Sequence, residues 1–246
     1  MKGIVISLCD ITGVAAKPWV DAGYSAILVD PQHPEGVTVE GRVTKVGRVI
    51  DHPETWAVLH AAIATGKVRF VHGFPPCTDL AASGNRWKAD KLAANPKYQF
   101  EAMQVVWQCH VISELAQCPY FVENPIGQVS SFWRKPDHIF QPWWYTGFCE
   151  NDHYKKKTCL WTGGGFRMPK PFMANFDTEP DERIYRAGKG PERENFRSAT
   201  PSGFARAVFF ANLHKQERKL NTALDKTLRT DQHSSSLSSA NSPSHP

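Results

Sequence analysis

Two tripeptides of this 246-residue chain could do chemistry together: a Pro-Pro-Cys sequence that ends at Cys77, and a Glu-Asn-Pro sequence that begins at Glu123. Each follows a short apolar run, at 68–71 and 120–122, with the composition of a buried strand. If the two strands are neighbours in a parallel sheet, their carboxyl ends bring a thiol and a carboxyl group into one crevice, where open α/β sheets bind ligands. A thiol nucleophile beside a proton donor can attack a pyrimidine ring and open it to alkylation. The pairing predicts an enzyme.

The residues after Cys77 are typical of a helix start, so we expect a helix to begin near 78–80. A thiol at a helix N-terminus has a lowered pKa and is more readily the reactive thiolate. The two prolines before Cys77 stiffen the approach to it. The alternative is a cysteine that acts only as a small buried hydrophobic residue.

Glu123 follows three apolar residues, a position where a carboxylate is costly unless it is paired. Burial raises the pKa of a carboxyl group, so Glu123 can stay protonated and donate a hydrogen bond to a ring nitrogen. The alternative is a glutamate at a strand end that caps a neighbouring helix.

The segment 6–13 joins the first predicted strand to the first predicted helix. A tight turn there would expose backbone N–H groups at the helix N-terminus, where a carboxylate or phosphate can bind. About twenty residues further on, Asp30 ends the second strand, where an acidic side chain can accept both hydroxyls of a ribose. Together the two features predict a cofactor that contains adenosine. The alternative is an ordinary strand–turn–helix connection.

The elements that must position these groups alternate along the first half of the chain. Strands are predicted at 4–8, 26–29, 68–71 and 120–122, and helices at 15–22, 55–64 and 99–117. The segment that carries Val43, Val46 and Val49 reads as a polar stretch between elements. This alternation predicts an α/β fold with a doubly wound, mostly parallel sheet, similar to the Rossmann fold.

The second half has a different texture. Residues 127–197 are loop-rich, aromatic and basic, with one late strand at 158–162, and a closing helix is predicted at 204–213. We therefore expect a catalytic domain over 1–213 with a reduced substrate-binding insert at 127–197. A polar C-terminal helix at 214–229 and a Ser-rich, disordered tail at 230–246 complete the prediction.

Composition limits the class of protein. No apolar run approaches the roughly 18 residues of a membrane span, and the N-terminal apolar stretch is too short for a signal peptide. The six cysteines form no CxxC pair, so reduced thiols and a cytoplasmic location are expected. Four residues could be considered as zinc ligands, but their spacing matches no common module, and no metal is expected: His138, Cys149, His153 and Cys159.

These motifs resemble those of the cytosine-5 DNA methyltransferases. The segment 7–13 is similar to the family's first, cofactor-binding motif, Asp30 to its ribose contact, Cys77 to its nucleophile and Glu123 to its catalytic glutamate. The segments 7–13, 155–166 and 197–212 also resemble compact methyltransferase-like proteins often carried by bacteriophages and prophages. The resemblance covers about residues 1–213. It implies a monomer that acts in DNA methylation, as in restriction-modification, in a bacterial or phage-infected cell.

The resemblance also implies a mechanism. The Cys77 thiolate attacks carbon 6 of a cytosine flipped out of the duplex, while Glu123 protonates ring nitrogen 3. Carbon 5 then takes a methyl group from S-adenosylmethionine, and loss of the carbon-5 proton releases Cys77. Asn124 and Pro76 shape the catalytic pocket. The residues implied in cofactor binding are Ser7, Leu8, Cys9, Asp10, Thr12, Gly13, Asp30, Asp51 and Pro75.

Three departures from the family pattern keep alternatives open. Ile11 stands where the family has glycine, and Cys9 where it has phenylalanine. The base-contacting arginine pair is replaced by a lysine run at 155–157, of which Lys157 is the predicted contact, with Arg197 and Thr200 as further substrate-binding residues. The 40 residues from Lys157 to Arg197 are too few for a full target-recognition domain. An enzyme acting on free cytosine nucleotides and an inactive DNA-binding relic are the competing interpretations.

Overall fold

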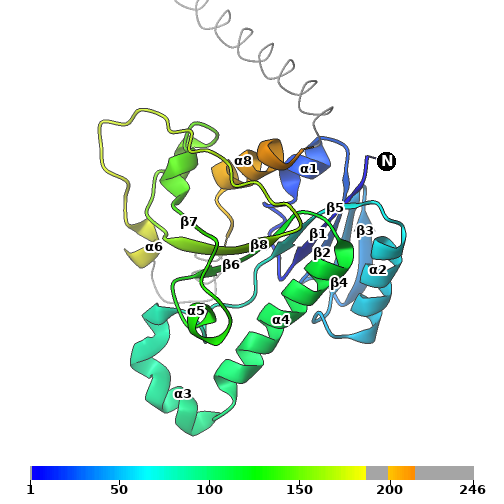
Figure 1. The fold of residues 1–246 in the computed structure, drawn as a ribbon, viewed down its shortest axis with the longest axis horizontal. Helices are drawn as coiled ribbons and strands as arrows, with labels where there is room; N and C mark the ends of the chain where they lie inside the picture. Colours follow the sequence, from blue (N-terminus) through cyan, green and yellow to red (C-terminus); the bar gives the residue numbers. More distant parts are fainter. Residues whose placement is uncertain (1, 187–198, 214–246) are drawn as a thin grey trace, which may run out of the picture.

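The structure is a computed structural model, and it describes residues 2–186 and 199–213. Its centre is an eight-stranded sheet in the order β3-β4-β2-β1-β5-β6-β8-β7 (Figure 1). The strands are β1 Ile4–Leu8, β2 Ser25–Val29, β3 Gly36–Glu40, β4 Val43–Gly47, β5 Val68–Gly73, β6 Tyr120–Pro125, β7 His138–Phe140 and β8 Thr158–Gly163. The helices are α1 Lys17–Asp21, α2 Pro53–Ala64, α3 Lys88–Ala94, α4 Tyr98–Ala116, α5 Val129–Phe132, α6 Arg183–Arg186 and α8 Ser202–Asn212.

The five central strands, β4-β2-β1-β5-β6, are parallel, and the edges are antiparallel. The chain builds outward from β1 to β2 and β4, then crosses to β5 and β6 on the other side of β1. Strand order therefore reverses between β1 and β5, and doubly wound sheets bind ligands beyond the carboxyl ends of the strands at such a point. The predicted α/β fold with a mostly parallel sheet is confirmed.

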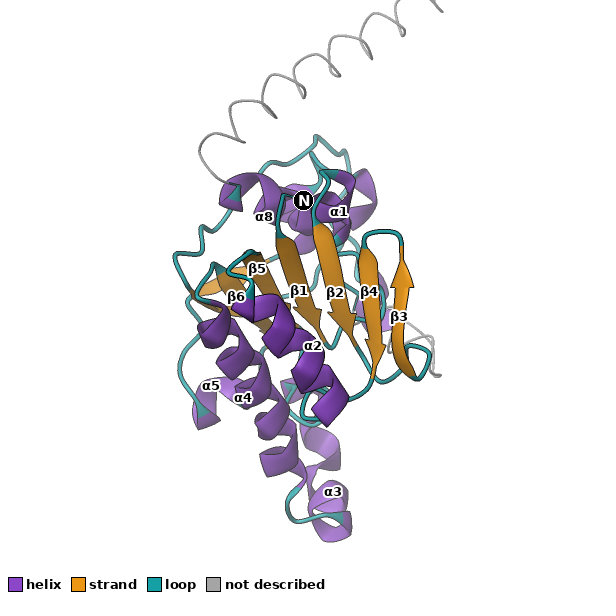
Figure 2. Cartoon of the chain, turned by 90° about the vertical axis from the view of Figure 1, so that its right-hand side faces the viewer, coloured by secondary structure: helices purple, strands orange, loops and turns teal. Residues whose placement is uncertain are grey.

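Two apolar layers cover the sheet, because successive side chains of a strand point to opposite faces. In β1, Ile6 and Leu8 belong to the core cluster that also contains residues of α2 and α4. Val5 belongs to the opposite cluster, with residues of α1 and α8. Figure 2 shows α2 and α4 lying over one face of the sheet. Complete burial of side chains such as Ile6 and Leu8 contributes about 1.5–3 kcal/mol each.

Three local predictions need correction. The polar stretch near Val43 is a β-hairpin, β3–β4, whose two-residue turn begins with Gly41 at φ +61°, a conformation that favours glycine. The first helix spans five residues, since it begins at Lys17 after a turn and is followed by Gly23 at φ +92°. Within the segment 127–197 a strand that was not predicted, β7, pairs with β8, and the two strands extend the sheet beyond β6.

Among the helices of the described residues, none is long and apolar enough to cross a membrane. The predicted strand at 158–162 and closing helix at 204–213 correspond to β8 and α8. The predicted C-terminal helix at 214–229 and the tail at 230–246 lie outside the described residues.

Candidate active site at the carboxyl ends of the parallel strands

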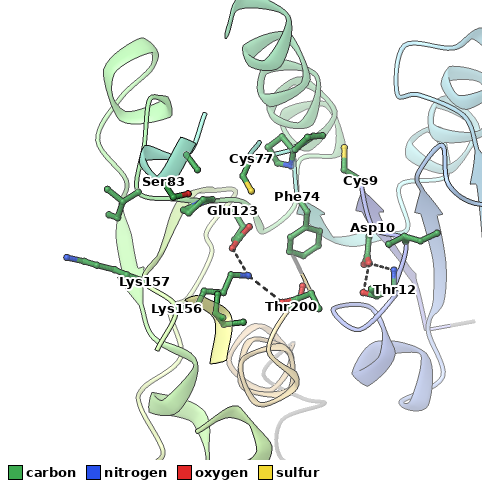
Figure 3. Close-up of a pocket in the computed structure, with 18 of the residues that line it drawn as sticks. Cys9, Asp10, Thr12, Phe74, Cys77, Ser83, Glu123, Lys156, Lys157 and Thr200 are labelled. Carbon is green, nitrogen blue, oxygen red and sulfur yellow. Dashed lines mark hydrogen bonds and ion pairs between the residues drawn. The ribbon is translucent and has the colours of Figure 1, made fainter. Parts of the chain in front are cut away.

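Strands β5 and β6 pair in parallel, with Val71 opposite Tyr120 and Gly73 opposite Val122. The two chemical motifs therefore lie at the same edge of the sheet, as predicted, although Glu123 and Asn124 still belong to β6 and pair with β8. A cavity of about 360 Å³ opens there and is lined by both Cys77 and Glu123. In Figure 3 the thiol of Cys77 points toward the carboxyl group of Glu123.

The loop that carries Cys77 is held by the end of β6 and by the segment that follows it. Asn124 is buried, and its Nδ2 donates to the carbonyl oxygen of Pro75 at 2.9 Å. Further along, Gln128 N donates to Leu80 O at 2.7 Å, and Ala82 N donates to Ile126 O at 2.9 Å. The position of the nucleophile thus depends on residues next to Glu123 in sequence.

Glycine is required at one point of this contact. A Cβ atom built on Gly127 would lie 2.0 Å from the carbonyl oxygen of Leu80, far inside van der Waals contact. Any side chain at 127 must therefore push the loop after Cys77 away from β6.

The helix predicted to begin after Cys77 does not form. The N–H groups of Leu80 and Ala81 both donate to Cys77 O, at 3.0 and 2.8 Å, which closes a single turn. Leu80 is then fully buried, and Ala81 pairs with Gly127 as an isolated bridge, so the chain is drawn off the helical path. A short 3₁₀ helix, Ala82–Trp87, follows. The prediction of a helix N-terminus at this thiol is therefore wrong.

Glu123 is largely buried, with 14% of its side chain exposed. Burial raises the pKa of its carboxyl group, while the nearby ammonium of Lys156 partly opposes this rise. Lys156 Nζ lies 3.7 Å from Glu123 Oε1 and 3.5 Å from the carbonyl oxygen of Ala199. The pKa of Glu123 is therefore raised overall, and the residue keeps its proton to a higher pH than an exposed glutamate does.

Lys156 is the functional candidate that sequence reasoning missed. The predicted base contact, Lys157, also lines the cavity, but it is exposed, and Figure 3 shows its side chain directed away from Glu123. The sequence held part of the signal, because the two-residue period of a strand places Lys156 on the same face as Leu160. That Leu160 pairs with Glu123 is seen only in the β6–β8 ladder of the structure. Thr200 lines the cavity, and Arg197 lies outside the described residues.

The turn after β1 lines the first cavity with Asp10 and Thr12, but part of its predicted anion site is used by the chain itself. Asp10 is buried, and its carboxylate accepts hydrogen bonds from Thr12 N at 3.0 Å, Thr12 Oγ1 at 3.0 Å, Gly13 N at 2.7 Å and Ser7 Oγ at 2.7 Å. The chain's own carboxylate thus occupies two of the backbone donors that were predicted to bind a ligand. Cys9, next to Asp10, has φ +56° and lines the cavity.

A second cavity, of about 280 Å³, lies at the ends of β1 and β2 and shares Cys9 and Pro76 with the first. Asp51 lines this second cavity, as its predicted cofactor role requires. Asp30 is buried, accepts a hydrogen bond from Gln32 N at 2.8 Å, and is not among the residues that line either cavity. Burial raises the pKa of the Asp30 carboxyl group. Its contact with a ribose stays a prediction.

Comparison with models of known protein families finds no match, and comparison with curated protein sequences finds none either. Within residues 2–186 and 199–213, no group of three or more His, Cys, Asp or Glu side chains could hold a metal ion.

Proposed function

We propose that this chain is an S-adenosylmethionine-dependent methyltransferase that acts on carbon 5 of cytosine in DNA. The observation that carries the proposal is the pairing of Cys77 and Glu123 across one cavity at the carboxyl ends of adjacent parallel strands. A nucleophilic thiol and a buried carboxyl group with a raised pKa are the two groups that a covalent attack on a pyrimidine requires.

In the proposed reaction, the Cys77 thiolate forms a bond to carbon 6 of the cytosine. Glu123 donates its proton to ring nitrogen 3, so the electron pair displaced from the ring is held as an enamine, nucleophilic at carbon 5. Donation leaves Glu123 as a carboxylate, and the ammonium of Lys156, 3.7 Å from Oε1, stabilises that charge. After alkylation, a water molecule takes the carbon-5 proton, and the double bond between carbons 5 and 6 re-forms as the bond to Cys77 breaks and restores the thiolate. Nitrogen 3 returns its proton to the Glu123 carboxylate.

The lining of the second cavity supports the proposed cofactor. It combines apolar side chains, which an adenine ring can contact, with carboxylates and amides, which can meet ring nitrogens and ribose hydroxyls. The apolar residues include Val29, Val49, Ile50 and Val105, and the polar ones include Asp51, Glu101, Gln104 and Gln108. Both cavities include Cys9 and Pro76, so a molecule in the second cavity can extend past these residues into the first cavity, where Cys77 and Glu123 lie. S-adenosylmethionine would supply the electrophilic methyl group.

The test is mass spectrometry of nucleosides from the DNA of cells that express the wild type or Cys77→Ser. We expect 5-methylcytosine with the wild type only. The purified wild type should also form a stable covalent adduct with DNA that contains 5-fluorocytosine, because the carbon-5 fluorine cannot leave as a proton. DNA without a modified base, and without an adduct, would contradict the proposal.

Modification of free cytosine nucleotides is the second candidate. The observation in its favour is that β7 and β8 of the segment 127–197 belong to the sheet, which leaves little of that segment for a separate recognition domain. Incubation with labelled cofactor and either an oligonucleotide or dCMP distinguishes the two substrate classes.

A further inference from the structure

A basic arm with an exposed tryptophan projects from the rim of the cavity. The arm comprises the 3₁₀ helix Ala82–Trp87 and α3, Lys88–Ala94, and neither helix buries a residue. Figures 1 and 2 both show α3 lying away from the sheet. Because neither helix places a side chain in the core, core packing does not determine which residues the arm contains.

The arm begins at the cavity and is held to the catalytic loop through α3. Ala82 and Ser83 line the cavity together with Cys77. Lys91 Nζ, on α3, returns to the loop, where it donates to Thr78 O at 2.9 Å and to Asp79 Oδ1 at 2.6 Å. The arm therefore holds a defined position relative to the nucleophile.

Trp87 is the large apolar side chain at the middle of the arm. It is 51% exposed, and the guanidinium of Arg86 lies over its ring at 5.2 Å from the centroid. Three basic side chains (Arg86, Lys88 and Lys91) and one acidic one (Asp90) make the arm positive. An exposed indole within a positive segment is the composition that proteins use to bind single-stranded nucleic acid, since any base can stack on an aromatic ring while cations meet the phosphates.

We infer that Trp87 stacks on an unpaired base beside the target cytosine, and that the arm makes single-stranded DNA the preferred substrate. Trp87 is four residues past Ser83, or about 8 Å at the 2.0 Å rise of a 3₁₀ helix, which corresponds to two or three stacked bases. An indole can reach the face of a base only if a neighbouring base does not cover it, so the partner must be unstacked. This inference rests on the proposed function, because it takes the base in the cavity as the target.

The experiment measures binding separately from transfer, by fluorescence anisotropy of a labelled 13-mer with one central cytosine and the full chain carrying Cys77→Ser. Adding Trp87→Ala should weaken single-strand binding by about 5- to 150-fold, since stacking on one base contributes about 1–3 kcal/mol. Trp87→Phe should retain most of the affinity. Trp56→Ala is the matched control, because Trp56 is 37% exposed on α2, outside the arm. It should leave the affinity unchanged.

Oligonucleotides with a single abasic site identify the stacked base. If the removed base is the one that stacks on Trp87, its loss should lower the affinity of the protein with Trp87 as much as Trp87→Ala does. The two changes together should lower the affinity no more than either change alone. In a fully paired duplex, Trp87→Ala should have little effect.

Three outcomes would overturn the inference. The first is that Trp87→Ala and each abasic site within three nucleotides of the target lower the affinity independently. The second is an equal loss of affinity for duplex and single-stranded DNA, and the third is a change in oligomeric state on Trp87→Ala. The last would show that the indole contacts a second copy of the chain. The binding measurements do not depend on methyl transfer: coupling between Trp87 and the abasic site can be observed with no transfer, and transfer can be observed with no coupling. The failure of this inference and the failure of the proposed function are therefore distinguishable.

Discussion

The two halves of the crevice use their polar side chains differently. Beyond β5 and β6, Cys77 and Glu123 face the cavity, and a third residue, Asn124, holds the loop. Beyond β1, Asp10 also lines this cavity, but its buried carboxylate accepts hydrogen bonds from the N–H groups of Thr12 and Gly13. In the first half chemistry and support are divided between residues, while in the second half the acidic residue itself supports the turn.

This difference predicts different consequences of substitution. Where a side chain faces a cavity, its loss removes chemistry and leaves the fold intact. Where a buried carboxylate satisfies several donors, its loss leaves those donors unpaired, which costs about 1–3 kcal/mol for each. The same kind of change should therefore lower the rate in one half and the stability in the other.

The largest effect is expected for Cys77→Ser in the catalytic half. A hydroxyl is a far poorer nucleophile than a thiolate at neutral pH, so methyl transfer should fall by at least about 1,000-fold. The melting temperature should stay within a few degrees of the wild type, because Cys77 lines the cavity rather than the core. Cys149→Ser, a second half-buried thiol, is the control and should retain activity. Full turnover in Cys77→Ser would remove this thiol from the mechanism.

Gly127→Ala tests whether the position of Cys77 depends on the segment after β6. The added methyl group would lie 2.0 Å from Leu80 O, so the loop after Cys77 must shift. A misplacement of about 1 Å at a reacting group can cost about 100-fold in rate, and we expect a loss of that order in kcat with a smaller change in KM for the cofactor. Gly41→Ala, in the β3–β4 turn, is the control for strain away from the site: no atom lies within 4 Å of its added Cβ, so the strain of its positive φ should lower the melting temperature and leave kcat unchanged. Unchanged kcat in Gly127→Ala would show that the loop tolerates the shift.

Asp10→Ala and Asp30→Ala separate support from binding in the other half. Asp10→Ala should lower the free energy of unfolding by about 1–3 kcal/mol, because it leaves the buried Ser7 hydroxyl without its acceptor and releases the turn at Gly13 N. Asp30→Ala should mainly weaken the affinity for S-adenosylmethionine, by about 10- to 150-fold, which is equivalent to one charged hydrogen bond to the ribose. Chemical denaturation and calorimetric titration measure the two quantities. An unchanged cofactor affinity in Asp30→Ala would show that the ribose is held elsewhere.

Sequence reasoning succeeded where one short-range pattern decides the outcome. The apolar runs at 68–71 and 120–122 identify buried strands, and the alternation of strands with helices makes them parallel neighbours, which brings Cys77 and Glu123 together. It failed where distant contacts decide. The turn after Cys77 is set by Leu80 entering the core and Ala81 pairing with Gly127, and neither contact can be read from residues 78–80. The role of Asp10 as an internal acceptor depends likewise on how tightly the turn closes.

The smallest expected effect concerns Lys156, which ties the catalytic half to β8. Its ammonium lowers the pKa of Glu123, against the larger rise that burial causes. In Lys156→Gln that opposing charge is gone, so the pKa of Glu123 should rise further. If the protonated carboxyl group is the active form, activity is lost as the pH rises through this pKa. The alkaline limb of the kcat profile should therefore move to higher pH in Lys156→Gln. Lys157→Gln, one residue away but exposed, should leave the limb unmoved.

Stability gives an independent reading of the same group. A carboxyl group with a raised pKa in the folded state binds its proton more tightly when folded, so its contribution to stability is lost as the pH rises from its ordinary pKa to the folded one. The loss of melting temperature between acidic and neutral pH should be larger in Lys156→Gln than in the wild type, and smaller in Glu123→Gln, which cannot ionise. If Lys156→Gln instead moved the rate profile to lower pH, or left both readings unchanged, the ion pair seen at 3.7 Å would have no part in setting the protonation of Glu123.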